Sequence, residues 1–513
     1  MPKLHPILTV GAMSLLLVVS ASGQENGVEP VHADVVQQFM NEAFANSEIM
    51  ENAGWLTDVF GPRNSKSSGY QAAAEWSRDR LQEYGLTNSH LEPFHFGRGW
   101  ENQYTSMHMV APTYLRIIGY PAAWSAGSDG PVRLEATHVD LDRIESAADL
   151  DPYRDAIAGR LVLVAPLQDL SNQYWPDVSP YSDDELDAMA APRSDSDGER
   201  RRRDPGLSLA DRYDLVWEAG AAAIARPDGT NAYGTVDGAV NGYSMERAMW
   251  RTNAPAPIQE WILAAEHYNR MVRILQKGLP VEIEAEIRVD FADDDDLDYN
   301  VIAEIPGSDL ADEIVLLGGH LQSEGIGTGA TDNAAGVVVS MEVVRIFQAL
   351  GIQPRRTVRI ALFGGHEMGV IGNTSHVAKY YADVENREYG PEYDKLSGFF
   401  NVDNGGGRIV GLSVLDSEPL HEIFSEWIKP LRSLGMRHLF PTGMEHESYE
   451  VVGLNGFYFH QDRRDDRRYH TNMDVYDRLT EDDLMANAVI LATFVYHAAM
   501  RDEMLPRAYP RPW

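Results

Sequence analysis

One strand-helix-strand pattern, between Glu313 and Asn373, constrains the fold of this chain more than any other feature. It contains two short apolar runs, IVLLGG and TVRIALFGG, each closed by two glycines, and such runs predict buried strands. Between them, apolar residues recur at helical spacing until Gly351. The residues on this helical face are Val337, Val338, Met341, Val344 and Phe347. Two parallel strands joined by a helix predict an α/β sheet in which the carboxyl ends of the strands lie side by side.

Polar residues follow each of these predicted strands. His320 ends the first strand, and Asp332 lies at the start of the predicted helix. The second strand is followed directly by His366 and Glu367. Ligands of open α/β sheets bind in the crevice beyond the carboxyl ends of the strands. We therefore expect these side chains to converge at one edge of the sheet.

Two later segments add candidate metal ligands. Asp403 lies in GFFNVDNGGG, between an apolar run and a run of glycines, and His470 lies in RRYHTNMDVYDRL. The candidate ligands are therefore His320, Asp332, Glu367, Asp403 and His470. Any one of them alone could instead be a helix cap, a surface charge or a buried core histidine. Their shared position near strand ends and glycines favours a metal site.

The chemistry of this donor set points to zinc. Nitrogen and oxygen donors without thiolate suit zinc, and a carboxylate shared by two ions would give each ion an imidazole and a further carboxylate. Two metal ions about 3.5–4 Å apart can activate a water and polarise a carbonyl, as they do in aminopeptidases. The sequence thus predicts a centre for two zinc ions that acts on an amide bond.

The candidate ligands lie in motifs that occur in the order GGHLQS, GATDNAAG, FGGHEMG, NVDNGG and YHTNMDVYDRL. In order and spacing these motifs resemble the co-catalytic zinc exopeptidases, which include bacterial leucyl aminopeptidases, glutamate carboxypeptidase and carboxypeptidase Q. The resemblance implies a first zinc on His320, Asp332 and Asp403, and a second on Asp332, Glu367 and His470. It also implies that Asp332 bridges the two ions and that the peptide bond between Asp332 and Asn333 is cis.

The chain departs from the family pattern at two positions. His366 stands where the family has a Glu, the general base that takes a proton from the attacking water. Gln322 stands where the family has an Asp that accepts a hydrogen bond from the ligand His320. A glutamine can still accept that hydrogen bond, but it brings no negative charge to raise the basicity of the imidazole.

These departures leave three functions open. A histidine can act as general base near neutral pH, so the chain can be a peptidase for dipeptides or short peptides with His366 as its base. It can instead be a catalytically inactive relative that keeps its metals and binds peptides. A weaker alternative is acyl transfer of the glutaminyl cyclase kind, which uses a single zinc. The sequence leaves open whether a peptidase would cleave from the N- or the C-terminus.

The resemblance also implies a domain organisation for this chain of 513 residues. Residues 298–505 would form the catalytic part of a three-layer α/β/α, phosphorylase/hydrolase-like peptidase domain, and residues 33–124 its N-terminal part. Residues 125–290 resemble a protease-associated domain, a β-rich lobe, in the segments AGRLVLVAP and EAGAAAIARPDG. Within this lobe, residues 169–207 are rich in Asp, Ser and Pro, and we expect an inserted surface excursion there.

A glycine-containing segment, PTGMEHES, resembles a segment that contacts substrate in the family. Its Glu445 stands where the family has Asp, and its His446 is the family residue. A role for both at the substrate cleft is expected from the resemblance, and a surface loop is the alternative.

Composition excludes several partners and chemistries. The chain carries 78 acidic and 43 basic residues, a net charge of −35 that repels nucleic acid. It has no Cys, which excludes disulfides, thiolate zinc sites and a cysteine nucleophile. Apart from the N-terminal segment, no run approaches the roughly 18 apolar residues of a membrane span. We expect a peptide substrate and no membrane span, and the sequence leaves the oligomeric state open.

Residues 1–23 have the pattern of a secretory signal peptide, with a lysine near the start, the apolar stretch ILTVGAMSLLLVVS and the small-residue site ASG. We predict that the mature protein is secreted or periplasmic and begins near Gln24. Intact-mass measurement of native protein should show the loss of residues 1–23. A native protein that retained Met1 would contradict this prediction.

Overall fold

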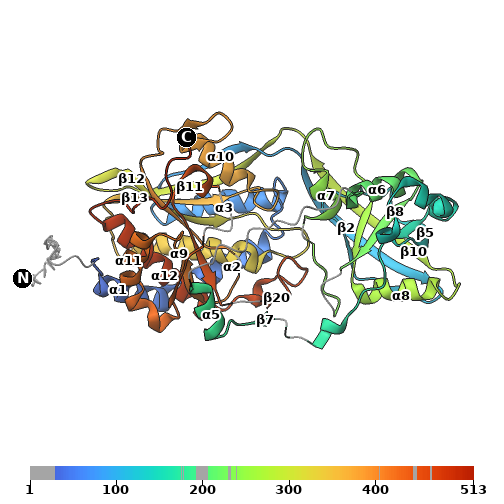
Figure 1. Cartoon of the computed structure of the whole chain (residues 1–513), viewed down its shortest axis with the longest axis horizontal. Helices are drawn as coiled ribbons and strands as arrows, with labels where there is room; N and C mark the ends of the chain where they lie inside the picture. The colour runs from blue at the N-terminus through green and yellow to red at the C-terminus, as the bar shows by residue number, and fades with distance from the viewer. Residues whose placement is uncertain are drawn as a thin grey trace, which may run out of the picture.

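The computed structural model describes residues 29–513 except 175, 177, 192–205, 229–232, 239, 404, 443–447 and 463–464. The chain forms two bodies that lie side by side along the long axis of the molecule (Figure 1). Each body is built on a sheet of eight strands. We call the body that contains β12 the first body, and the body formed by residues 99–292 the second body.

The sheet of the first body delivers several strand ends to one edge. Its order is β1 (Thr87–His95), β11 (Leu297–Ile305), β13 (Arg356–Phe363), β12 (Leu310–His320), β16 (Leu396–Asn401), β19 (Gly456–Gln461), β17 (Ile409–Ser413) and β18 (His438–Phe440). The neighbours β13, β12, β16 and β19 are parallel to one another, whereas β11 runs antiparallel to β13. The carboxyl ends of four adjacent strands therefore meet at one edge, as the predicted α/β pattern requires.

Helices cover both faces of this sheet. Alternate residues of β12 point to opposite faces, so Val315 and Leu317 join one apolar cluster while Ile314 and Leu316 join another. The first cluster contains residues of α1 (Ala33–Asn46), α2 (Ile49–Gly54), α3 (Ser68–Glu83), α9 (Ala335–Ala349), α11 (Glu418–Trp427) and α12 (Glu481–Met500). On the other face, Val377 of α10 (Ile371–Tyr380) packs in the second cluster. The predicted three-layer α/β/α fold is confirmed, and burial of both faces explains why the central strands are continuous apolar runs.

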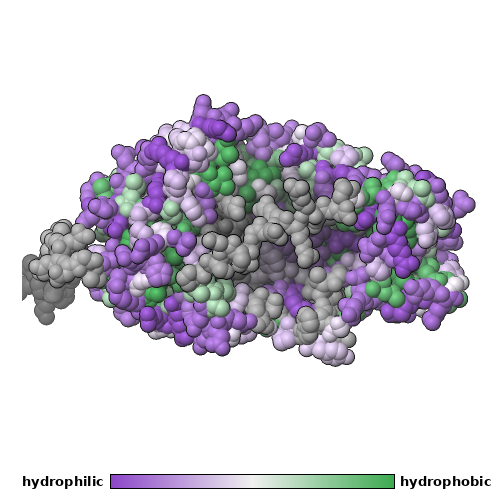
Figure 2. All heavy atoms as spheres, viewed as in Figure 1, coloured by the Kyte–Doolittle hydropathy of each residue, from purple (hydrophilic) through white to green (hydrophobic). Residues whose placement is uncertain are grey.

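The last long helix, α12, is long and apolar enough to cross a membrane, but 89% of its apolar window is buried inside the molecule. It packs on α9 and α1, so it serves here as a core helix. Hydrophilic residues dominate the visible surface of both bodies, with apolar residues scattered among them (Figure 2). This surface agrees with the acidic composition of the chain.

The second body contains a mixed sheet. Its order is β3 (Leu115–Arg116), β2 (Gly99–Ala111), β10 (Glu282–Ala292), β5 (Val132–His138), β6 (Leu161–Leu163), β8 (Ala223–Pro227), β9 (Glu260–Leu263) and β4 (Gly119–Pro121). Its helices are α4 (Arg154–Ile157), α6 (Leu209–Glu218), α7 (Gly242–Glu246) and α8 (Ala265–Leu275). Two-stranded pairs join β14 (Ala382–Asp383) to β15 (Glu388–Tyr389) and β7 (Val178–Ser179) to β20 (Asp465–Asp466).

The boundary between the bodies differs from the sequence prediction. Residues 99–121 were expected to belong with the N-terminal part of the first body, but their strands β2, β3 and β4 are part of the second sheet. In particular, β2 pairs with β10 from end to end. Alternation along residues 100–124 reveals a strand but not its partner, because pairing depends on residues far away in the sequence.

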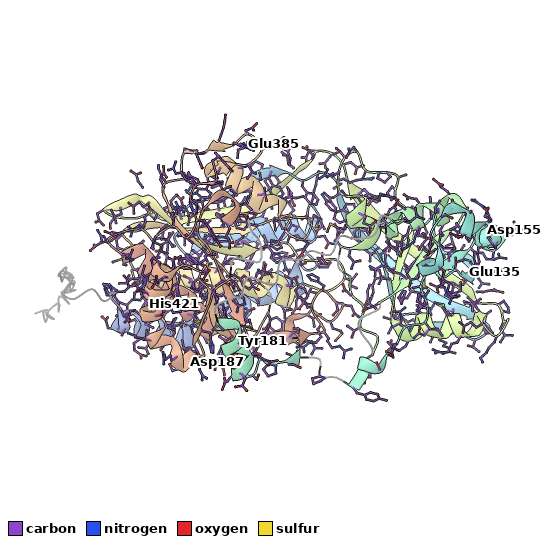
Figure 3. All side chains as sticks on the ribbon, viewed as in Figure 1. Glu135, Asp155, Tyr181, Asp187, Glu385 and His421 are labelled. Carbon is purple, nitrogen blue, oxygen red and sulfur yellow. The ribbon has the colours of Figure 1, made fainter. Side chains whose placement is uncertain are left out.

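Part of the expected surface excursion, residues 169–207, contacts the first body. Its helix α5 (Asp183–Ala190) places Leu186 against Val410 and Phe440 of the first body. Figure 3 shows Tyr181 and Asp187 beside the first body, far from Asp155 at the outer end of the second body. The described residues of this excursion therefore bridge the two bodies.

A buried arginine ties the N-terminal segment to the central loops of the first body. Arg63, in the loop before α3, is fully buried and donates to backbone carbonyls at both ends of the segment 321–329. The acceptors are Leu56 O (2.7 Å), Leu321 O (2.8 Å), Thr328 O (2.7 Å) and Gly329 O (2.9 Å). Burial lowers the pKa of the guanidinium to about 10, which still leaves it charged at neutral pH.

We predict that Arg63→Met lowers the free energy of unfolding by about 3–5 kcal/mol, because several buried carbonyls lose their donors at once. Thermal and urea unfolding of the metal-free protein would measure the loss. The matched control is Arg78→Met, which removes a partly exposed ion pair with Asp79 and should cost less than about 1 kcal/mol. Equal effects of the two substitutions would contradict the prediction.

Candidate metal centre

The edge formed by the parallel strands holds the predicted ligands. His320 is the last residue of β12, and Glu367 follows β13 after two glycines. Asp403 lies just beyond β16, and His470 lies in the loop that follows β19. Glycine is required beside His320, because a Cβ at Gly319 would lie 2.6 Å from the carbonyl oxygen of Val402. Strand order and close backbone packing therefore bring residues from distant parts of the sequence together.

These side chains form two groups that share one residue. The ligand atoms of each group lie within 4.8 Å of one another. The groups are His320, Asp332 and Asp403, and Asp332, Glu367 and His470. They are the same two sets that the resemblance implied.

Asp332 occupies the centre of the cluster. Its Oδ1 lies 3.0 Å from Nε2 of His320, and its Oδ2 lies 2.6 Å from Nε2 of His470. The Nε2 atom of His320 also lies 3.1 Å from Oδ1 of Asp403. The two oxygens of one carboxylate therefore face two different imidazoles, which is the arrangement of a bridging ligand.

The electrostatics of the cluster favour positive charge. Burial alone would lower the pKa of His320, but Asp403 and Asp332 raise it well above its usual value. Burial likewise opposes protonation of His470, but Asp332 and Glu324 raise its pKa to about 10. The pKa of Glu367 is raised by burial and by the negative charges of Asp332 and Glu324. Each imidazole thus holds a proton that a cation could replace.

The donor atoms also fit a metal. Oδ2 of Asp332 and Nε2 of His470 are buried without a hydrogen-bond partner, although they lie 2.6 Å apart. A cation bound between these two atoms would take the place of the proton on His470. Imidazole nitrogens and carboxylate oxygens without thiolate suit zinc.

The backbone around Asp332 is fixed from both sides. The peptide bond between Asp332 and Asn333 is cis, as the resemblance implied. The carboxylate of Asp474 accepts hydrogen bonds from Thr331 N (2.8 Å), Thr331 Oγ1 (2.8 Å) and Asp332 N (3.2 Å). On the other side, the amide of Asn333 donates to Val402 O (2.9 Å).

Asp474 was not identified from the sequence. Its burial raises its pKa to about 6, although hydrogen bonds from Thr331 oppose the rise. The usable signal was its position four residues after His470, in the same loop.

His366 lies inside the cluster and is 7% exposed. Its ring stacks on that of His320, with centroids 3.9 Å apart and planes inclined by 6°. Its Nε2 atom lies 3.5 Å from Oδ2 of Asp403. The ligand atoms of His320, His366 and Glu367 also lie within 4.8 Å of one another. The imidazole is therefore close enough to the candidate ligands to exchange a proton with a group held there.

Gln322 does not accept the hydrogen bond from His320 with its side chain, as the sequence had suggested. Its backbone carbonyl lies 2.6 Å from Nδ1 of His320 and takes that role. Its side-chain oxygen instead accepts from Glu367 N (3.0 Å), and its amide donates to Ser323 O (2.7 Å). Gln322 thus connects the loops that carry His320 and Glu367.

Glu324 was also missed by sequence reasoning. It is 6% exposed, and its Oε2 atom lies 3.6 Å from Nδ1 of His470. Burial raises its pKa to about 7, although His470 opposes the rise. Its signal was an acidic residue in the glycine-rich loop after His320. The expected substrate residues Glu445 and His446 lie outside the described residues.

Comparisons with known proteins agree with this geometry. Residues 300–495 match the model of Peptidase family M28. The chain is 25% identical over 502 residues to carboxypeptidase Q of Rattus norvegicus, covering 93% of this chain and 91% of the relative. Its fold is similar to a peptidase M28 precursor from Shewanella amazonensis, with a TM-score of 0.66 and 21% identity over 94% of this chain and 98% of that one.

The fold is also similar to BSAP, a zinc aminopeptidase from Bacillus subtilis, with a TM-score of 0.58 and 15% identity over 90% of this chain and 97% of that one. At these identities the solved structures show the fold alone, whereas the family match includes every candidate ligand. Residues 300–495, which carry every candidate ligand, therefore match Peptidase family M28, and this match together with the donor set supports a zinc metallopeptidase.

Proposed function

We propose that this chain is an exported exopeptidase that uses two zinc ions to hydrolyse dipeptides or short peptides. The observation that carries the proposal is the position of Asp332, whose two oxygens face His320 and His470 in two separate ligand groups. A carboxylate shared in this way suits a pair of ions. The relative and the solved neighbour are named carboxypeptidase and aminopeptidase, and both names denote removal of terminal residues.

The residues of the cluster would divide the work. Zinc bound there supplies Lewis acidity, which polarises a carbonyl and activates water. His320 and Asp403 would hold one ion, Glu367 and His470 the other, and Asp332 both. His366 would accept the proton of the attacking water at its imidazole and return it to the leaving amine.

A second function is favoured by one specific observation. By the resemblance, His366 stands where related peptidases have a carboxylate. A carboxylate is negatively charged when it accepts a proton, whereas an imidazole is neutral. A protein that keeps its metals without an efficient base would bind peptides and release them uncleaved. Turnover of a dipeptide panel by zinc-loaded protein separates this binder from an enzyme, and dipeptides blocked at either end give the direction of cleavage.

We predict that the mature protein binds about two zinc ions per chain and that Asp332→Ala loses more zinc than any other single ligand substitution. Asp332 is the one ligand common to both groups, so its loss removes a donor from each. Elemental analysis after zinc reconstitution measures the content. Asp309→Ala, at an exposed aspartate paired with Arg355, is the matched control and should keep both ions. Wild-type protein without stoichiometric zinc would refute the proposed function.

Zinc binding should weaken as the pH falls. The metal-free His470 has a pKa of about 10, so below that pH a proton must leave before zinc can bind. The pKa of metal-free His320 is also raised, so zinc must displace a proton there too. Apparent affinity should therefore rise with pH across the neutral range, and calorimetry in buffers of different ionisation enthalpy should detect the released protons.

We predict that His366→Ala lowers kcat/KM by about 10²–10⁴-fold, the usual effect of losing a general base. Wild-type activity should rise with pH as the imidazole loses its proton. His421→Ala is the matched control, because His421 is an exposed residue of α11 (Figure 3) and is not among the candidate ligands. The three proteins would be compared at equal zinc content.

His366→Glu completes this series. If the chain is a peptide-binding relative, wild type and His366→Ala should be equally inactive, while His366→Glu gains activity because fold and ligands remain. If wild type is fully active and His366→Ala is equally active, the result would contradict both the peptidase with His366 as its base and the peptide-binding protein. Another group, such as Glu445 or His446, would then have to take the proton.

A further inference from the structure

We infer that Glu324 is the positioning residue for His470: its carboxylate accepts the hydrogen bond from Nδ1 of His470 and so fixes the imidazole that binds the second zinc. The inference deepens the proposed function and rests on it, because it requires a metal ion at Nε2 of His470. Neither the family resemblance nor the comparisons assign a role to Glu324.

The geometry places an acceptor without a partner beside Nδ1 of His470. Oε2 of Glu324 is buried and has no hydrogen-bond partner, and it lies 3.6 Å from Nδ1 of His470. The side chains of Glu324 and His470 are 3% and 17% exposed. Because little solvent reaches the carboxylate, an oxygen left unpaired there costs free energy that a hydrogen bond would recover. A shift of less than about 1 Å brings the two atoms to hydrogen-bond length.

The chemistry of a metal-bound imidazole supplies the missing donor. Nε2 of His470 faces Asp332, so a metal shared with Asp332 would bind that nitrogen. A neutral imidazole that binds metal through Nε2 carries its hydrogen on Nδ1. A carboxylate that accepts this hydrogen bond fixes the ring orientation and raises the basicity of the ligand.

The two imidazoles of the centre therefore have different partners. Nδ1 of His320 faces the backbone carbonyl of Gln322, a neutral acceptor, whereas Nδ1 of His470 faces the carboxylate of Glu324. The negative charge that Gln322 does not provide on one side of the centre is thus present on the other side. Loss of Glu324 should consequently affect one ion much more than the other.

The second body holds Glu324 and His470 in place. The backbone N–H of Val240 donates to the carboxylate of Glu324. Gly238, two positions before Val240, donates from its backbone N–H to the carbonyl oxygen of His470 over 2.8 Å. Asn472 adds a paired contact, since its side-chain oxygen accepts from Val236 N (2.8 Å) and its own N–H donates to Val236 O (3.0 Å). A segment of the second body therefore completes the half of the metal centre that contains His470.

The test compares wild type, Glu324→Ala and Glu324→Gln in the full mature chain. Zinc affinity would be measured by competition with a chelator, and cobalt absorption would report the geometry of each ion. We expect Glu324→Ala to weaken one of the two ions by about 10–100-fold and to leave the other unchanged. Glu324→Gln, which keeps the side-chain volume and one acceptor oxygen, should fold normally and show a smaller loss.

Two controls distinguish loss of the contact between Glu324 and His470 from a general loss of protein stability. Glu260→Gln neutralises a buried carboxylate of the second body, paired with Arg226, and should leave both zinc affinities unchanged. In a His470→Ala background, Glu324→Ala should have no further effect on the remaining ion, because the two residues act as a unit.

The outcomes distinguish the inference from the proposed function. Wild type and both Glu324 variants binding two zinc ions with equal affinities would overturn the inference and leave the proposed function intact. Equal weakening of both ions, together with a lower melting temperature of the metal-free protein, would assign Glu324 a merely structural role and also overturn the inference. A wild type that binds fewer than two ions would overturn the proposed function and the inference together.

Discussion

The carboxylate of Asp332, held between His320 and His470, is the interaction on which the rest of the site depends. Its two oxygens can face two imidazoles only if the backbone on either side is fixed. Asp474 binds the residues before it, and the amide of Asn333 binds the backbone after it. Arg63 secures the preceding loop through its carbonyls. These buried polar contacts therefore help to orient one side chain.

Burying this cluster is unfavourable without a cation. Three carboxylates and three imidazoles lie within one small region, and desolvation of several charges costs more than their mutual attraction returns unless each is well paired. In the metal-free state, the protonated imidazoles of His320 and His470 offset part of the negative charge. Divalent ions would offset it more completely, so the fold and the metals should stabilise each other.

The sequence predicted the parts of the site that depend on local pattern. Strand periodicity and paired glycines placed His320 and Glu367 at neighbouring strand ends, and two later segments supplied Asp403 and His470. The sequence could not reveal that the side chain of Gln322 points to the backbone of Glu367, because that direction is set by tertiary packing. Strand β2 was assigned to the wrong body for the same reason, since its partner β10 lies far away in the sequence.

The two halves of the metal centre have different neighbours. In the half of the centre that contains His320, a neutral backbone carbonyl and the stacked ring of His366 stand where carboxylates were expected. In the half that contains His470, Glu324 adds a carboxylate, which the second body holds through Val240. The two imidazoles of the centre thus lie beside acceptors of different charge. Two ions bound there would have unequal environments, and the ion bound by His470 would depend on contact between the two bodies.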